Sequence, residues 1–120
     1  MPTPCRVLLV DDEEDACLVL GDVLECSGCE VRSVSDPLAA VREGNAERYD
    51  LVLLDIRMPR MSGIEVLRRI RDRGHGAIVM LTGYVDEELE AEARREGAAE
   101  VLHKPVDLEY LLQRIDGLRA

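Results

Sequence analysis

Five short apolar runs, separated by stretches with helical periodicity, constrain the fold of this chain more than any other feature of its sequence. A run such as Val7-Leu8-Leu9-Val10 is apolar on both faces, which is typical of a strand that helices cover on both sides. A predicted helix follows each run after a short connection, so the chain favours a parallel sheet with right-handed crossovers. We therefore predict a doubly wound α/β fold with strands at residues 6–10, 30–34, 51–54, 77–81 and 100–103.

Helix signals occupy the stretches between these runs. Asp36 before Pro37 predicts an N-cap followed by the first helical position. Further helices are expected to begin at Ser62 or Gly63, at Asp86 and at Asp107. In the first helix, within residues 14–27, apolar side chains recur with a period of 3.6 residues and should face the sheet; they are Ala16, Val19, Leu20, Val23 and Leu24.

Length and charge exclude several classes of protein. The 120 residues suit one domain, which we expect to cover residues 1–120. A net charge of -10 leaves no basic footprint for a nucleic acid, and it disfavours contact with an anionic membrane. No apolar run approaches the length of a membrane span, and residues 1–4 lack the pattern of a signal peptide. We expect a soluble, cytoplasmic domain.

Cysteine and histidine side chains raise the alternative of a redox or zinc site. Cys26 and Cys29 have the spacing of a redox pair, but they close a predicted helix rather than open one. There is no second pair of this kind, and neither His75 nor His103 has zinc-finger spacing from it. We interpret the two cysteines as reduced, small, buried or half-buried side chains, His75 as a solvated loop residue, and His103 as a strand-end residue.

Polar residues at the ends of the predicted strands form the candidate functional site. Asp11 and Asp12 follow the first strand, Asp55 follows the third, Thr82 closely follows the fourth, and Lys104 follows the fifth. In a doubly wound fold these carboxyl ends line the ligand crevice. Three carboxylates in one crevice would repel one another unless a cation neutralised them, and oxygen ligands suit Mg²⁺.

Lys104 is the only lysine in a chain that otherwise uses arginine for its basic residues. This usage suggests a position that requires a compact point charge rather than a planar guanidinium group. A carboxylate beside Mg²⁺ and an ammonium group can attack a phosphoryl group and hold it as an aspartyl phosphate. The Thr82 hydroxyl could then donate a hydrogen bond to a phosphoryl oxygen, and Gly83 leaves room for that group.

With these motifs in order along almost the whole chain, the sequence resembles the receiver domain of two-component response regulators. The matching segments are residues 7–13 (VLLVDDE), 51–59 (LVLLDIRMP), 61–63 (MSG), 81–83 (LTG) and 103–105 (HKP). The resemblance implies a flavodoxin-like, three-layer fold whose five-stranded parallel sheet has the order 2-1-3-4-5. Each segment is weak evidence alone, but five in the expected order are specific.

The resemblance also implies a role for each site residue. Asp55 would be the phosphoacceptor, Thr82 the switch hydroxyl and Lys104 the cation that binds the phosphoryl group. Mg²⁺ would be ligated by Asp12, Asp55 and the backbone carbonyl of Arg57, with Asp11 acting mainly through water. Val101 replaces the Tyr or Phe often found three residues before the lysine, so the aromatic form of the switch is not expected; Tyr84 could partly substitute for it.

The implied partners are a sensor histidine kinase or a histidine phosphotransfer domain as the phosphoryl donor, and an output domain or a separate target protein. The resemblance also allows a phosphorylation-dependent homodimer. The chain could act alone or as the input half of a longer regulator. Apart from its own phosphotransfer and dephosphorylation, no enzyme activity is expected. The resemblance implies a signalling phosphoacceptor that switches a protein-interaction surface.

Competing functions fit the residues less well. A phosphotransferase of the haloacid dehalogenase type needs a second aspartate two residues after the first, where this chain has Arg57. A flavodoxin needs a phosphate-binding loop after the first strand, where this chain has three acids. The glycine fingerprint of a dinucleotide enzyme is missing. A receiver that has lost phosphorylation would lack one of the residues named above, and all are present.

Overall fold

A computed structural model describes residues 5–119; residues 1–4, on which the expectation of no signal peptide depends, and residue 120 lie outside the described residues. Five parallel strands form one sheet in the order β2-β1-β3-β4-β5, which confirms the predicted fold and strand order. The strands are β1 (Arg6–Val10), β2 (Glu30–Val34), β3 (Leu51–Asp55), β4 (Ala77–Thr82) and β5 (Glu100–His103). Two of them, β3 and β4, extend one residue beyond the predicted ends.

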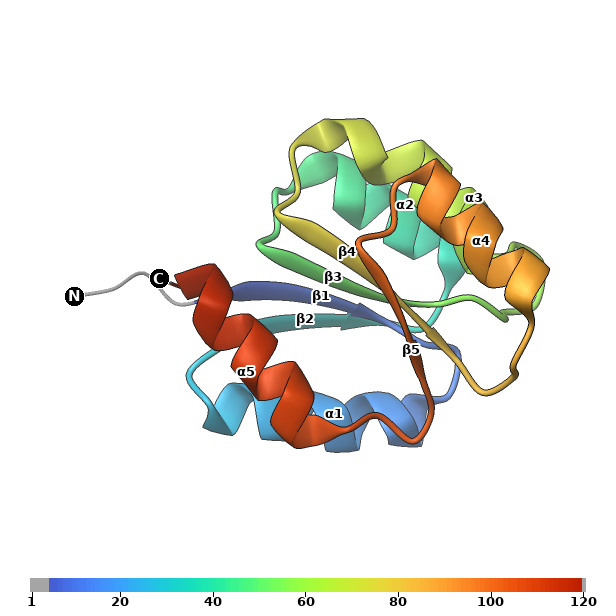
Figure 1. The fold of residues 1–120 in the computed structure, drawn as a ribbon. Coiled ribbons are helices and arrows are strands. Elements are labelled where there is room, and N and C mark those ends of the chain that lie inside the picture. The colour runs from blue at the N-terminus through green and yellow to red at the C-terminus, as the bar shows by residue number, and fades with distance from the viewer. Residues whose placement is uncertain (1–4, 120) are drawn as a thin grey trace.

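Helices cover both faces of the sheet (Figure 1). On one face lie α1 (Glu14–Cys26) and α5 (Leu108–Arg119). On the other lie α2 (Pro37–Ala46), α3 (Gly63–Ile70) and α4 (Glu87–Glu96), with the short 3-10 helix η1 (Arg71–Arg73) after α3. Among residues 5–119, none of these helices combines the length and apolar composition needed to span a bilayer.

The central strands β1, β3 and β4 divide their side chains between the two helical layers. Val7 and Leu9 of β1 pack in the cluster that contains Leu24 of α1 and Leu111 of α5. The alternate residues of the same strands join the opposite cluster, with side chains of α2, α3 and α4. Because successive side chains of a strand point to opposite faces, a run that is apolar throughout fits only this sandwiched position.

The predicted helix starts at Asp36, Ser62, Asp86 and Asp107 are confirmed. In the first three cases the side chain accepts a hydrogen bond from a backbone N–H group in the first turn of the helix. The carboxylate of Asp107 likewise accepts from the Tyr110 N–H group at 3.1 Å. These caps satisfy N–H groups that would otherwise lack partners at the helix ends.

The predicted inner face of α1 is partly wrong. Cys17, Gly21 and Leu24 are its buried residues, whereas Val19 is 66% exposed. Cys17, Gly21 and Leu24 are spaced i, i+4 and i+7 and therefore form one stripe on the helix. The prediction weighted the large aliphatic side chains and overlooked a cysteine and a glycine that are buried.

Two further predictions need correction. His75 is half-buried rather than solvated: its Nδ1 atom accepts from the Tyr49 N–H group at 3.1 Å, and its Nε2 atom lies 2.8 Å from the Gly44 carbonyl oxygen. Cys26 is exposed, although Cys29 is buried as expected. Cys26 lies in the last turn of α1, outside the buried stripe of that helix, and therefore faces solvent. Among the described residues, neither cysteine belongs to a group of candidate metal ligands.

Candidate functional site

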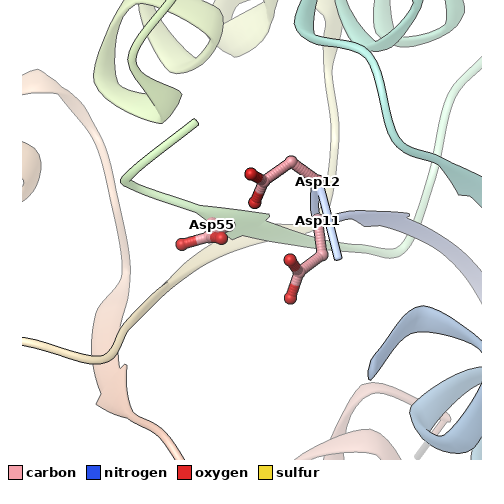
Figure 2. A group of neighbouring side chains, drawn as sticks. All are labelled: Asp11, Asp12 and Asp55. Carbon is pink, nitrogen blue, oxygen red and sulfur yellow. The ribbon is translucent and has the colours of Figure 1, made fainter. Parts of the chain in front are cut away.

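Parallel pairing of β1 and β3 places the candidate carboxylates next to each other. Val10 is paired with Leu54, so the residues that follow in register are Asp11 and Asp55. Oxygen atoms of Asp11, Asp12 and Asp55 all lie within 4.8 Å of one another. Figure 2 shows the three side chains gathered at the ends of β1 and β3. The structure thus brings together the three acids that the sequence predicted to converge.

Lys104 reaches this group from beyond the end of β5, although β4 separates β5 from β3. Its backbone N–H group donates to the carbonyl of Thr82 at 2.8 Å. This hydrogen bond continues the pairing with β4 one residue beyond the end of β5. The Nζ atom donates to Oδ2 of Asp11 at 2.9 Å and to Oδ2 of Asp55 at 3.2 Å. The peptide bond between Lys104 and Pro105 is cis.

Burial and charge act in opposite directions on the ionisation of the site. Burial raises the pKa of the Asp55 carboxyl to about 6; the positive charge of Lys104 lowers it and the negative charge of Asp11 raises it. Burial alone would lower the pKa of Lys104, but the hydrogen bond to Asp11 and the charge of Asp55 raise it above its usual value. The ammonium group therefore stays charged at neutral pH.

Backbone N–H groups orient the two buried carboxylates. Oδ1 of Asp11 accepts from the Glu13 N–H group at 2.9 Å, and Oδ1 of Asp55 accepts from the Arg57 N–H group at 3.3 Å. In each carboxylate, one oxygen thus accepts a hydrogen bond from a backbone N–H group and the other accepts one from Lys104. This arrangement fixes the rotamers of two charged side chains that are only 3% and 4% exposed.

Gly63 allows the loop after β3 to fold back against Asp55. Its N–H group donates to the carbonyl of Ile56 at 2.8 Å. A Cβ atom added at this position would lie 2.0 Å from the carbonyl oxygen of Asp55. Only glycine fits so close to the backbone of the candidate phosphoacceptor, so the sequence Ser62-Gly63 serves both the cap of α3 and the shape of the site.

Thr82, at the end of β4, is 3% exposed, and its hydroxyl is engaged by the loop that follows. Its Oγ1 atom donates to the carbonyl of Tyr84 and accepts from the N–H group of the same residue, both at 3.2 Å. The Tyr84 ring lies under the guanidinium group of Arg57, whose Cζ atom is 4.3 Å from the ring centroid. Through Tyr84 and Arg57, the predicted site residue Thr82 is therefore connected to the loop that follows β3.

Sequence reasoning missed two contacts at the site. The Arg57–Tyr84 contact could have been anticipated, because each residue lies two positions after a strand end on the same edge of the sheet. The second contact is the thiol of Cys17, which donates to the carbonyl of Asp11 at 3.4 Å. Burial raises the pKa of this thiol to about 11, so it remains protonated and unreactive at neutral pH.

The residues of the site fit a hard divalent cation. Three carboxylates and one ammonium group leave an excess of two negative charges in a largely buried crevice. The available atoms are oxygens, and among the described residues this is the group of acidic, histidine or cysteine side chains close enough to share an ion. Oxygen donors and an uncompensated double charge favour Mg²⁺ over a softer metal.

A family model described as the response regulator receiver domain matches residues 7–116. The chain belongs to this family. The receiver domain is the phosphoacceptor module of two-component signal transduction, so the resemblance read from the sequence is confirmed. Receivers of this family interact with histidine kinases and output domains.

Similar proteins agree with this assignment. The transcriptional regulatory protein FixJ of Azorhizobium caulinodans is 35% identical over 108 residues, which are 89% of this chain and 51% of that protein. A CheY-like receiver domain from Methanospirillum hungatei has a TM-score of 0.89 at 29% identity and covers 96% of this chain and 93% of its own. A Burkholderia pseudomallei response regulator, solved with a phosphorylated aspartic acid and a calcium ion, has a TM-score of 0.86 at 27% identity, over 92% of this chain and 66% of its own. The chain spans about half the length of the curated relatives it matches.

Proposed function

We propose that residues 1–120 form one receiver domain that accepts a phosphoryl group on the carboxylate of Asp55. The observation that supports this most directly is the position of the single lysine, whose ammonium group lies 3.2 Å from Asp55 and 2.9 Å from Asp11. A carboxylate that is buried, oriented by a backbone N–H group and next to a fixed positive charge is suited to attack an electron-poor phosphorus atom.

In the proposed reaction, a carboxylate oxygen of Asp55 attacks the phosphorus atom of a phosphohistidine. A phosphorus–oxygen bond forms, the phosphorus–nitrogen bond breaks, and the imidazole leaves with the electron pair and takes up a proton. Lys104 neutralises the charge that builds up on the phosphoryl oxygens. Mg²⁺, held by Asp11, Asp12, Asp55 and the Arg57 carbonyl, would supply further positive charge to those oxygens.

The phosphoryl group is later lost to water, which returns the Asp55 carboxylate and inorganic phosphate. These two steps on its own side chain are the only catalysis that we assign to the chain. The phosphorylated aspartic acid in the similar Burkholderia pseudomallei protein supports an acyl phosphate as the stored form. The Thr82 hydroxyl would donate to one phosphoryl oxygen, and the open space beside Gly83 accommodates the group.

The proposed partners follow from this chemistry. The donor is a sensor histidine kinase or a histidine phosphotransfer domain in the cytoplasm, and the recipient of the signal is an output domain or a separate target protein. A longer regulator is supported by the relatives, of which this chain spans about half. A stand-alone regulator that acts on a separate target protein is the alternative. A homodimer formed on phosphorylation is compatible with either.

The test is the intact mass of the protein after incubation with acetyl phosphate, with Mg²⁺ and with a chelator. We expect one added phosphoryl group in wild type, only when Mg²⁺ is present, and none in Asp55→Asn. The matched control is Asp72→Asn, which removes an exposed acid of η1 and should leave the adduct unchanged. An adduct that persists in Asp55→Asn, or that forms equally without Mg²⁺, would contradict the proposal.

A further inference from the structure

The Thr82 hydroxyl has one proton, and in this structure it points to the backbone of Tyr84. The O–H group donates to the Tyr84 carbonyl at 3.2 Å, and the oxygen accepts from the Tyr84 N–H group at the same distance. A hydroxyl can donate only one hydrogen bond. A phosphoryl group on Asp55 must therefore compete with the Tyr84 carbonyl for the proton of Thr82.

The side chain of Tyr84 is held in place from the opposite side of the site. Tyr84 is 61% exposed, so few packing contacts fix its side chain. The guanidinium group of Arg57 lies over the Tyr84 ring, with Cζ 4.3 Å from the centroid. Arg57 itself is tied to the phosphoacceptor, because its N–H group donates to Oδ1 of Asp55. The contact joins the loop after β3 to the loop after β4.

We propose that the stacking of Arg57 on Tyr84 is a latch that holds the Thr82 hydroxyl on the Tyr84 backbone and thereby opposes its donation to the phosphoryl group. Arg57 and Tyr84 are positioning residues in this account, since they act through Thr82. The inference rests on the proposed function of Asp55. In this account the side chains of Arg57 and Tyr84 stabilise the unphosphorylated conformation.

The size of the expected effect follows from the contact. A cation–π pair at an exposed site shifts a two-state equilibrium by about two- to five-fold. If only the unlatched conformation lets Thr82 reach the ligand, the apparent affinity for a phosphoryl analogue rises in proportion to the unlatched fraction. Breaking the latch should therefore tighten binding by about two- to five-fold while the Thr82 hydroxyl itself is unchanged.

The first experiment measures the dissociation constant of beryllofluoride by titration calorimetry in the presence of Mg²⁺. Tyr84→Leu removes the ring face but keeps the charge of Arg57, and it should bind about two- to five-fold more tightly than wild type. Tyr84→Phe is the matched control, because it keeps the ring and should stay close to wild type. Equal affinities for wild type and Tyr84→Leu, or an equal gain in Tyr84→Phe, would overturn the inference.

The second experiment removes the anion, so that the charge of Arg57 cannot affect the ligand. The amide chemical shift of Thr82 is measured by NMR in each free variant. It is then compared with the shifts of the same amide in free wild type and in wild type saturated with beryllofluoride. Arg57→Gln, Tyr84→Leu and the double variant should all move toward the saturated position by the same amount. Additive shifts in the double variant would mean that the two residues act separately, and no shift would mean that they do not restrain Thr82; either result overturns the latch.

Failure of the proposed function gives a different result. If wild type binds no beryllofluoride with Mg²⁺, both the phosphoacceptor role of Asp55 and the latch are wrong. If wild type binds and the variants do not differ from it, the phosphoacceptor role stands and only the latch is wrong.

Discussion

The ammonium nitrogen of Lys104 lies 3.2 Å from Oδ2 of Asp55, although the two residues are 49 positions apart and their strands are not neighbours. The same nitrogen lies 2.9 Å from Oδ2 of Asp11. One positive charge is therefore shared between two buried carboxylates. This sharing leaves the crevice negative enough to attract a divalent cation, yet keeps a fixed cation beside the candidate phosphoacceptor.

The first prediction concerns this shared charge. Lys104→Met keeps an unbranched side chain but removes the ammonium group, so we expect phosphorylation by acetyl phosphate with Mg²⁺ to slow by about 100-fold or more. The rate is measured by intact mass over time. Arg95→Gln, which removes an exposed charge from α4, is the control and should keep the wild-type rate. A rate for Lys104→Met within about two-fold of wild type would exclude a role for the ammonium group.

Asp55 should make the metal-free protein less stable at neutral pH than an uncharged residue would. Because burial raises its pKa above the usual value, the folded protein binds the proton more tightly than the unfolded chain does. The ionised carboxyl therefore costs stability as the pH rises from the unfolded pKa of about 4 through the folded pKa of about 6. We expect Asp55→Asn to raise the free energy of unfolding by about 1–3 kcal/mol at pH 7.5 without Mg²⁺.

Urea denaturation at pH 7.5 and at pH 4.5 checks this prediction. The gain from Asp55→Asn should shrink at the lower pH, where the folded wild type is already protonated at this residue. Asp50→Asn is the comparison, since Asp50 is exposed and accepts from the Arg6 N–H group at the opposite end of the sheet. A larger gain from Asp55→Asn at pH 4.5 than at pH 7.5 would reverse the sign of the linkage and refute the assignment.

Gly63 should be intolerant of a side chain. A Cβ atom would lie 2.0 Å from the Asp55 carbonyl oxygen, which is backbone and cannot move aside cheaply. We expect Gly63→Ala to lower the free energy of unfolding by about 2 kcal/mol or more. Gly117→Ala in α5 is the matched control; apart from the neighbouring residues and backbone of its own helix, nothing lies within 4 Å of the position that its Cβ atom would take, so it should stabilise the protein by up to about 1 kcal/mol. Equal effects at the two sites would contradict the packing described for the loop after β3.

His75 should make the protein sensitive to mild acid. Burial lowers its pKa, and the neutral ring accepts from the Tyr49 N–H group through Nδ1. A group with a lowered pKa contributes stability that is present above the unfolded pKa of about 6.5 and is lost as the pH falls below it. His75→Gln does not titrate, so the difference in unfolding free energy between it and wild type should move in favour of the variant from pH 7.5 to pH 5. A difference that is independent of pH would mean that the ring does not titrate on unfolding.

Much of the fold and of the candidate site could be predicted from the sequence. Apolar runs such as Leu51–Leu54 identify sandwiched strands, and a parallel sheet brings the residues after each strand to one edge. The neighbouring positions of Asp11, Asp12, Asp55 and Lys104 follow from that geometry alone.

The remaining features depend on contacts between segments that no periodicity relates. The ring of His75 pairs with backbone groups 26 and 31 residues away, which no local pattern reveals. Glu90 of α4 is buried with its carboxylate 3.1 Å from Nε2 of His103, a contact that no local sequence pattern indicates. The contact between Arg57 and Tyr84 differs, because the position of each residue two places after a strand end already puts both at the same edge of the sheet.

The most direct test of the central claim is to locate the phosphoryl group. The protein is incubated with acetyl phosphate and Mg²⁺, reduced with borohydride, and digested for peptide mass spectrometry. Borohydride converts an aspartyl phosphate to homoserine, so the phosphorylated residue is marked by a change in its own mass. We predict homoserine at position 55 and aspartate at positions 11 and 12. Homoserine at position 11 or 12, or an intact aspartate at position 55 in a protein that had gained the phosphoryl mass, would contradict the account.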